Sequence, residues 1–154
     1  MENSEKRSLL RDTELQTDAD GENSQACIEK QMREISHIFH YWGTKCAEFR
    51  EYAKQTQTDF DIWLANKKQE ALTEKAKIMD PKEASRFKRD ISESAKKELV
   101  ITTFEKEYRE KLYLIYENER KVEELEKALK AIEMKSFNLG SFASTMRKEY
   151  GTVK

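Results

Sequence analysis

The chain has 154 residues, of which four are Gly and one is Pro. These five residues are about 3% of the chain, against roughly 12% in average usage. Because turns depend on Gly and Pro, few turns can form, which excludes sandwiches, barrels and doubly wound sheets. With 38% charged and 37% hydrophobic residues, the composition predicts an all-α fold of long helices that each bury one stripe.

The net charge and the cysteine content limit which partners and which cellular compartment we expect. The chain has 29 Lys+Arg and 30 Asp+Glu, for a net charge of -1. A general nucleic-acid binder is usually strongly basic, so we expect no nucleic-acid partner. Cys27 and Cys46 lie in one predicted helix, too far apart to form a disulfide, and suit reduced thiols in a cytoplasmic protein.

The N-terminal residues read differently from the rest of the chain. Residues 1–25 hold seven acids and three bases, a net charge of -4, and no aromatic residue. Such a segment buries too little surface to offset its ordering entropy, so residues 1–24 are predicted to be a disordered acidic tail. Glu5, Leu9 and Leu10 match the spacing of an adaptor-binding dileucine signal, and the sequence leaves open whether this signal is used.

Helical periodicity begins near Ile28. Bulky residues recur at alternating spacings of four and three up to Trp63, which is the seam of a packed or supercoiled helix. The only Pro, Pro81, suits a first helical position, with Asp80 as the cap and Glu83 as its capping-box partner. We therefore expect one helix over 25–79 and another over 81–137, with Gly140 as a stop and a flexible tail or short helix over 138–154.

The two predicted helices have 55 and 57 residues, about 80–85 Å each at roughly 1.5 Å per residue. Near-equal lengths on either side of a break favour an antiparallel hairpin of BAR-like or coiled-coil type. Two helices alone have little core, so we expect self-association to complete it. Asn118 occupies a core slot of the second stripe, where it could set the register or lie at a wet edge of the bundle.

One stretch resembles a known family. Residues 86–99, and above all the run Ser92-Glu93-Ser94-Ala95-Lys96-Lys97-Glu98-Leu99, are similar to the start of the last long helix in the BAR domain of retromer-associated sorting nexins. The resemblance extends over roughly residues 30 to 135. It implies a helical scaffold at endosomal membranes, a BAR-type dimer and a retromer-type coat as partner. We expect the family's phosphoinositide-binding PX domain and its first BAR helix to be absent here.

The segment 65–90 between the helices is a candidate membrane-binding site. It has eight bases and five acids, a net charge of +3, and Lys or Arg near an anionic leaflet contributes on the order of 1 kcal/mol each. The resemblance also places lipid contacts at this end of the domain. The alternative without a binding function is an ordinary solvated helix surface with intrahelical ion pairs. The candidate residues are Lys67, Lys68, Lys75, Lys77, Lys82, Arg86, Lys88 and Arg89.

The periodic apolar residues are predicted to pack within the hairpin or against a partner. They are Ile35, Phe39, Trp42, Phe49, Phe60, Trp63, Ile101, Phe104, Tyr108, Ile115, Val122, Leu125 and Leu129. His37 and His40 lie near Glu34 without a second ligand cluster, so we predict no metal site. The sequence has no phosphate-binding loop or nucleophile motif, and we predict no catalytic residue and no cofactor.

The sequence therefore predicts a non-enzymatic helical scaffold. The leading hypothesis is membrane association and protein assembly in endosomal sorting and protein transport, with the protein cytoplasmic and peripheral on endosomal membranes. The homo- or heterodimer partner would be a BAR-type helical protein. The alternative is a coiled-coil structural or assembly subunit, cytoskeletal or chromosomal, with no lipid role.

Overall fold

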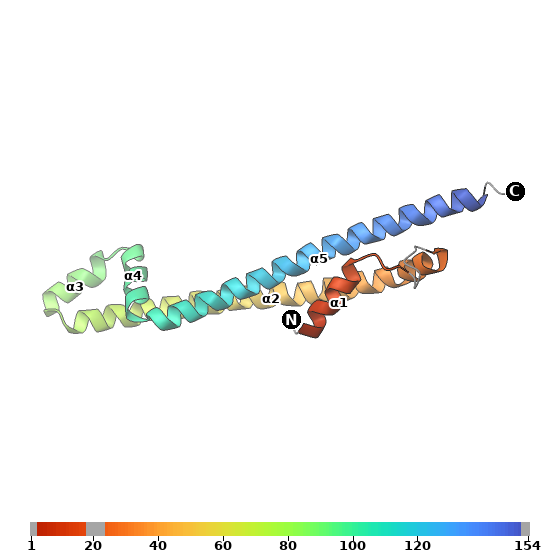
Figure 1. Cartoon of the computed structure of the whole chain (residues 1–154). Coiled ribbons are helices and arrows are strands. Elements are labelled where there is room, and N and C mark those ends of the chain that lie inside the picture. The colour runs from red at the N-terminus through yellow and green to blue at the C-terminus, as the bar shows by residue number, and fades with distance from the viewer. Residues whose placement is uncertain (1–2, 18–23, 152–154) are drawn as a thin grey trace. The chain divides into compact units, whose positions relative to one another are not determined.

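The computed structural model describes residues 3–17 and 24–151, and these residues form five helices and no strand (Figure 1). The helices are α1 (Asn3–Thr13), α2 (Gln25–Lys77), α3 (Pro81–Asp90), α4 (Glu93–Thr103) and α5 (Glu105–Gly151). The all-α prediction is confirmed. Contacts divide the chain into a first unit, Met1–Arg50 with Arg120–Lys154, and a second unit, Glu51–Glu119. Both α2 and α5 run through the two units.

Within each unit α2 and α5 pack antiparallel. In the second unit Lys67 lies over the ring of Phe104, and Thr56, earlier in α2, bonds to Asn118, later in α5. In the first unit Arg50 bonds to Glu126, whereas the first turns of α2 share a pocket wall with residues 143–147. As the residue number rises along α2, the residue number of its contact partner falls. The two helices therefore run antiparallel, as in the predicted helical hairpin.

Each unit has its own core. In the first unit Trp42, Cys46, Leu125 and Ile132 form one buried cluster together with Leu9 from α1. In the second unit three rings pack together. The centroid of Phe60 lies 5.9 Å from that of Trp63 and 5.6 Å from that of Tyr108. Such ring pairs add stabilisation beyond the apolar area they bury.

The prediction of one unbroken helix over 81–137 is wrong. A helix does begin at Pro81, but Asp80 makes no side-chain capping bond, so the predicted capping box does not form. Ile91 and Ser92 are extended, and the Ser92 hydroxyl accepts a hydrogen bond from the Ala95 backbone N–H at 3.2 Å. Serine is a strong N-cap, so it ends one helix and starts the next.

A second departure lies at Phe104, whose backbone leaves the helical region with φ -122° and ψ 38°. Two residues earlier, the Thr102 hydroxyl donates to the carbonyls of both Glu98 and Leu99. Hydroxyls bonded back to the preceding turn bend helices, and the β-branched run 100–103 has lowered helix propensity. The chain therefore turns between α4 and α5. In Figure 1 α3 and α4 rise from the end of α2 and return to it.

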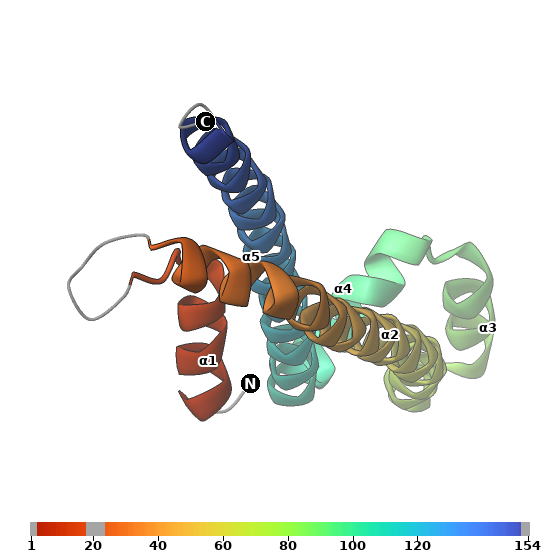
Figure 2. The ribbon, with the colours of Figure 1, turned by 90° about the vertical axis from the view of Figure 1, so that its right-hand side faces the viewer.

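Two predictions for the chain ends are also wrong. Gly140 does not stop the last helix, because Leu139 is 1% exposed and Ala143 and Met146 are half-buried beyond it. This continued packing offsets the roughly 0.5–1 kcal/mol cost of a helical glycine. The segment predicted to be a disordered tail forms α1, which lies against α2 and α5 within the first unit (Figure 2). Of that predicted tail, residues 14–17 and 24 are described and lie outside helices, and residues 1–2 and 18–23 lie outside the described residues.

Candidate functional site

The cations predicted to bind membrane fall into two groups. Three of these cations form ion pairs inside the second unit, namely Lys67, Lys68 and Arg89. Five others are exposed, and within residues 3–17 and 24–151 no ion pair is found for them. These five are Lys75, Lys77, Lys82, Arg86 and Lys88, and we call them the exposed cations.

Lys67 is a packing residue as much as a charge. Its Nζ lies 4.1 Å from the centre of the Phe104 ring and 2.7 Å from Glu70 Oε2, and its side chain is 20% exposed. The hydrogen bond to Glu70 is the main cause that raises the pKa of Lys67. A cation over an aromatic face gains about 0.5–2 kcal/mol. Lys67 therefore supports the bend at Phe104 from the facing helix.

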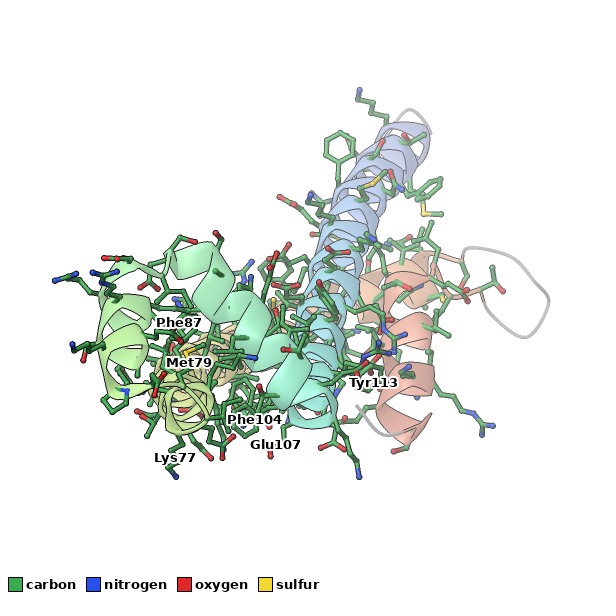
Figure 3. The ribbon with its side chains drawn as sticks, turned by 90° about the vertical axis from the view of Figure 1, so that its left-hand side faces the viewer. Lys77, Met79, Phe87, Phe104, Glu107 and Tyr113 are labelled. Atoms are coloured by element: carbon green, nitrogen blue, oxygen red, sulfur yellow. The ribbon has the colours of Figure 1, made fainter. Side chains whose placement is uncertain are left out.

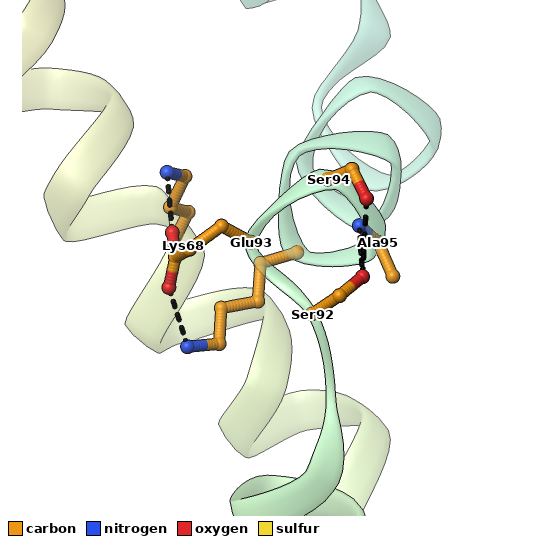
Figure 4. Close-up of polar contacts among 6 residues, drawn as sticks. Lys68, Ser92, Glu93, Ser94 and Ala95 are labelled. Atoms are coloured by element: carbon orange, nitrogen blue, oxygen red, sulfur yellow. Dashed lines mark hydrogen bonds and ion pairs between the residues drawn. The ribbon is translucent and has the colours of Figure 1, made fainter.

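Glu93 connects the start of α4 to α2. One carboxylate oxygen accepts from Lys68 Nζ at 2.9 Å and the other from Lys96 Nζ at 2.6 Å (Figure 4). These two hydrogen bonds lower the pKa of Glu93 to about 2. The capping hydroxyl of Ser92 stands beside this pair and also lies 3.0 Å from the Ser94 hydroxyl. The run that carries the sorting-nexin resemblance thus forms a helix start held by a cap and an ion-pair bridge.

The short helix α3 concentrates positive charge on an exposed element. It carries four bases, Lys82, Arg86, Lys88 and Arg89, against the acids Glu83 and Asp90. None of its residues is buried, and Phe87 is half-buried. Figure 3 shows Phe87 together with Met79 between the ribbons of α3 and α4, whereas Lys77 points outward. The arrangement is an amphipathic helix with its cations toward solvent.

The predicted packing residues divide by burial. Trp42, Phe60, Ile115 and Leu125 are buried in their units. Half-buried are Ile35, Phe49, Trp63, Ile101, Phe104, Tyr108, Val122 and Leu129. Phe39 is 45% exposed and so packs only partly within the chain. The apolar stripe of α2 is wider than its buried part, because Phe39 and Met32 on the same stripe are 45% and 38% exposed.

Asn118 is buried at a core position rather than at a wet edge, with 1% of its surface exposed. Its Nδ2 donates to the Thr56 hydroxyl at 3.1 Å, and that hydroxyl donates to the Tyr52 carbonyl at 2.9 Å. The amide oxygen Oδ1 has no hydrogen-bond partner among the described residues. A buried side-chain pair of this kind suits one register of α2 against α5 and no other.

A buried polar cluster in the first unit was missed by the sequence reasoning. Lys135 is 3% exposed and its Nζ donates to the Asp12 carbonyl at 3.1 Å. Asp12 Oδ2 accepts from Trp42 Nε1 at 2.9 Å. Burial lowers the pKa of the Lys135 ammonium, with the Asp12 charge acting against that shift. The only signal in the sequence was that Lys135 falls one turn after Ile132, on the buried side of the helix.

Two kinds of site were sought among the described residues, a cluster of metal ligands and a membrane-spanning helix. No cluster of three or more His, Cys, Asp or Glu side chains there is arranged to hold a metal ion. No helix over residues 3–17 and 24–151 combines the length and the apolar character that crossing a bilayer requires.

Comparison with known proteins adds no relative. No protein-family model, no curated protein and no solved structure matches this chain.

Proposed function

We propose that this protein is a non-enzymatic helical scaffold that associates with anionic membrane surfaces through the exposed cations. The support for this proposal is α3, a short exposed helix with a net charge of +2 that presents Lys82, Arg86 and Lys88 to solvent. Lys75 and Lys77 add two further charges in the last turn of α2. The resemblance to the sorting-nexin BAR domain adds the expectation of an endosomal membrane, of a role in protein transport and of a retromer-type coat as partner.

The proposed binding is electrostatic and peripheral. Each Lys or Arg near an anionic leaflet contributes on the order of 1 kcal/mol, so three such residues contribute roughly 3 kcal/mol, about a 100-fold change in partitioning. Attraction of this kind falls off within a Debye length of about 10 Å at 0.1 M salt. Binding should therefore weaken steeply as ionic strength rises.

Vesicle sedimentation tests the proposal. The protein should co-sediment with phosphatidylserine-rich vesicles at low ionic strength and much less with neutral phosphatidylcholine vesicles. Reversing Lys82, Arg86 and Lys88 to Glu removes three positive charges and adds three negative ones, so it should reduce partitioning by more than about 100-fold. A matched control reverses Lys54, Lys127 and Lys130, which changes net charge equally at exposed positions outside 65–90. If the wild type does not bind anionic vesicles, or if both triple variants lose binding equally, the membrane proposal is wrong.

The second candidate is an assembly subunit with no lipid role, and one observation favours it. On α5 Ile132 and Leu139 face the core at 0% and 1% exposure, whereas Met134 and Phe137 between them are 68% and 78% exposed. Large apolar side chains rimmed by polar ones mark protein-interaction surfaces. In this reading M134K combined with F137E lowers the mass measured by light scattering, and the vesicle assay shows no binding.

A further inference from the structure

The helix α1 fills a groove of the first unit that is built to receive a helix. The groove is formed by α2 and α5, and its floor is the buried cluster of Trp42, Cys46, Leu125 and Ile132. Leu9 of α1 completes that cluster and is 8% exposed, whereas its neighbour Leu10 is 64% exposed. With α1 in place, only one leucine of the dileucine-like pattern is accessible. We call this surface the α1 groove.

The α1 groove also recognises a carboxylate one helical turn after the leucine. Asp12, 8% exposed, accepts from Trp42 Nε1 through its side chain and from Lys135 Nζ through its carbonyl. The spacing from residue 9 to residue 12 places both side chains on one face of a helix. The groove therefore selects a helix with a leucine followed three residues later by an aspartate.

The segment after α1 is held by a reciprocal pair of bonds. The Gln16 backbone N–H donates to Gln31 Oε1 at 2.9 Å, and Gln31 Nε2 donates to the Gln16 carbonyl at 2.7 Å. The Cys27 thiol adds a bond to the same carbonyl at 3.3 Å. Residues 3–17 thus dock as one module, and residues 18–24 join it to α2.

Few buried side chains hold α1 in its groove. A helix of 11 residues is marginal in water without a surface to pack on. Among the described side chains of α1, only Leu9 and Asp12 are buried. These two side chains, the bonds of Gln16 to Gln31 and Cys27, and the 3.9 Å ion pair of Glu5 with Lys45 must together offset the ordering of the whole segment. Release of α1 exposes the apolar floor of the groove.

We propose that the α1 groove also binds α1 of a second copy, so that two copies exchange their N-terminal helices. A second copy offers the same leucine and aspartate at the same spacing, so every contact of the closed groove is reproduced without a new surface. Seven residues, the length of the segment 18–24, reach at most about 25 Å, so the groove of the second copy must lie within that distance of the start of α2. This exchange is independent of the proposed membrane binding.

Competition sets the size of the effect. A short tether holds α1 near its own groove at an effective concentration in the millimolar range. Exchange between copies should therefore become substantial as the protein concentration approaches about 1 mM. A free peptide should bind poorly to the wild type and much better to a chain whose own α1 cannot dock.

The first test uses a fluorescein-labelled peptide of residues 3–17, titrated with the full chain and followed by anisotropy. The variant L9D should bind the peptide at least 10-fold more tightly than the wild type does. L10D is the matched control, because it places the same charge on the neighbouring exposed residue, and it should behave as wild type. A peptide that carries D12A should bind L9D at least 10-fold more weakly than the unaltered peptide.

The second test identifies the occupant by sedimentation of the wild type, L9D and L10D at rising concentration. The wild type and L10D should form dimers and L9D should not, with equal helicity by circular dichroism as the check on folding. L9S serves in place of L9D if helicity falls. Equal dimerisation of L9D and L10D, or a wild type that stays monomeric while the peptide binds L9D, overturns the exchange. Absence of peptide binding to L9D overturns the groove itself.

Discussion

Replacing Asn118 with Leu is expected to stabilise the second unit. The amide of Asn118 is 1% exposed, it makes one hydrogen bond, to Thr56, and its Oδ1 has no partner among the described residues. The Thr56 hydroxyl keeps its bond to the Tyr52 carbonyl after the substitution. The change therefore removes an acceptor that has no partner, and although the Thr56 oxygen loses the donor of Asn118, the hydroxyl still has one hydrogen bond.

The magnitude follows from four contributions, two gains and two costs. Removing a buried unsatisfied acceptor gains about 1–3 kcal/mol, and losing the bond to Thr56 costs about 0.5–1.5 kcal/mol. Burying the apolar side chain of Leu gains about 1.5–3 kcal/mol. Fitting the larger side chain into the core costs about 1–3 kcal/mol. The net expectation is a gain of about 1–2 kcal/mol, with a weaker preference for the native register.

The assay reports the second unit alone. The chain has two Trp residues, Trp42 in the first unit and Trp63 in the second. In a W42F background, Trp63 fluorescence during urea unfolding follows the second unit. If the dependence of the unfolding free energy on urea concentration is unchanged, the midpoint urea concentrations of two variants can be compared directly. N118L should raise the midpoint of that transition.

The matched control is N118D, which keeps the shape of the side chain and buries an unpaired charge. It should destabilise the second unit by about 3 kcal/mol or more at pH 7, and the loss should shrink at acid pH as the carboxylate is protonated. If N118L is destabilising by more than about 1 kcal/mol, or N118D is neutral, then Asn118 is not buried as described and the reasoning is wrong.

Three further predictions concern the helix start at Ser92 and the buried Lys135. S92A should cost about 1 kcal/mol in the W42F urea assay, since it removes an N-cap, and S92D should preserve it; equal losses would refute the cap. E93Q should reduce the amide-exchange protection of α4 at pH 7. Because the pKa of Glu93 is lowered to about 2, the wild type loses the carboxylate charge as pH falls from about 4.5 towards 2, and the difference from E93Q should vanish over that range. A difference that does not depend on pH would contradict the bridge to Lys68. The pKa of Lys135 is lowered from 10.5, so the unfolded chain binds more protons and the stability of the first unit should rise as pH increases towards 10.5. In a W63F background, where Trp42 fluorescence follows the first unit during urea unfolding, K135M should abolish that rise. An equal rise with and without K135M would refute the prediction.

The spacing of residues along the sequence was enough to predict the structural features that depend on local periodicity. The alternation of four and three along residues 28–63 predicted α2, and Pro81 predicted the helix start after it. The break at Ser92 was missed because a serine inside a periodic stretch can cap a helix or continue it, and the hydrogen bond to a backbone N–H decides between them. The outcome was visible only in the fold.

The buried polar cluster could not be predicted for a different reason. Lys135 and Asp12 are 123 residues apart, and nothing near either residue in the sequence indicates the other. A lysine one turn after a core isoleucine reads as a side chain that extends to solvent. The acidic composition of the N-terminal segment likewise conceals that Leu9 and Asp12 are buried and anchor a helix. The exposed cations could be named from the sequence, but the partners of Lys67 and Lys68 could not.

The spread of sequence separations along the contacts has a consequence for the order of folding. Lys68 and Glu93 are 25 residues apart, Thr56 and Asn118 are 62, Arg50 and Glu126 are 76, and α1 meets α5 across 123. Closing the longest of these loops costs about 1.4 kcal/mol more entropy than closing the shortest. Pairing should therefore nucleate beside α3 and proceed away from it. During synthesis α1 emerges before α2 and α5 and docks after they pair. Leu9 therefore stays without its groove until residue 135 has left the ribosome, which leaves this helix open to capture by other chains of the same polysome.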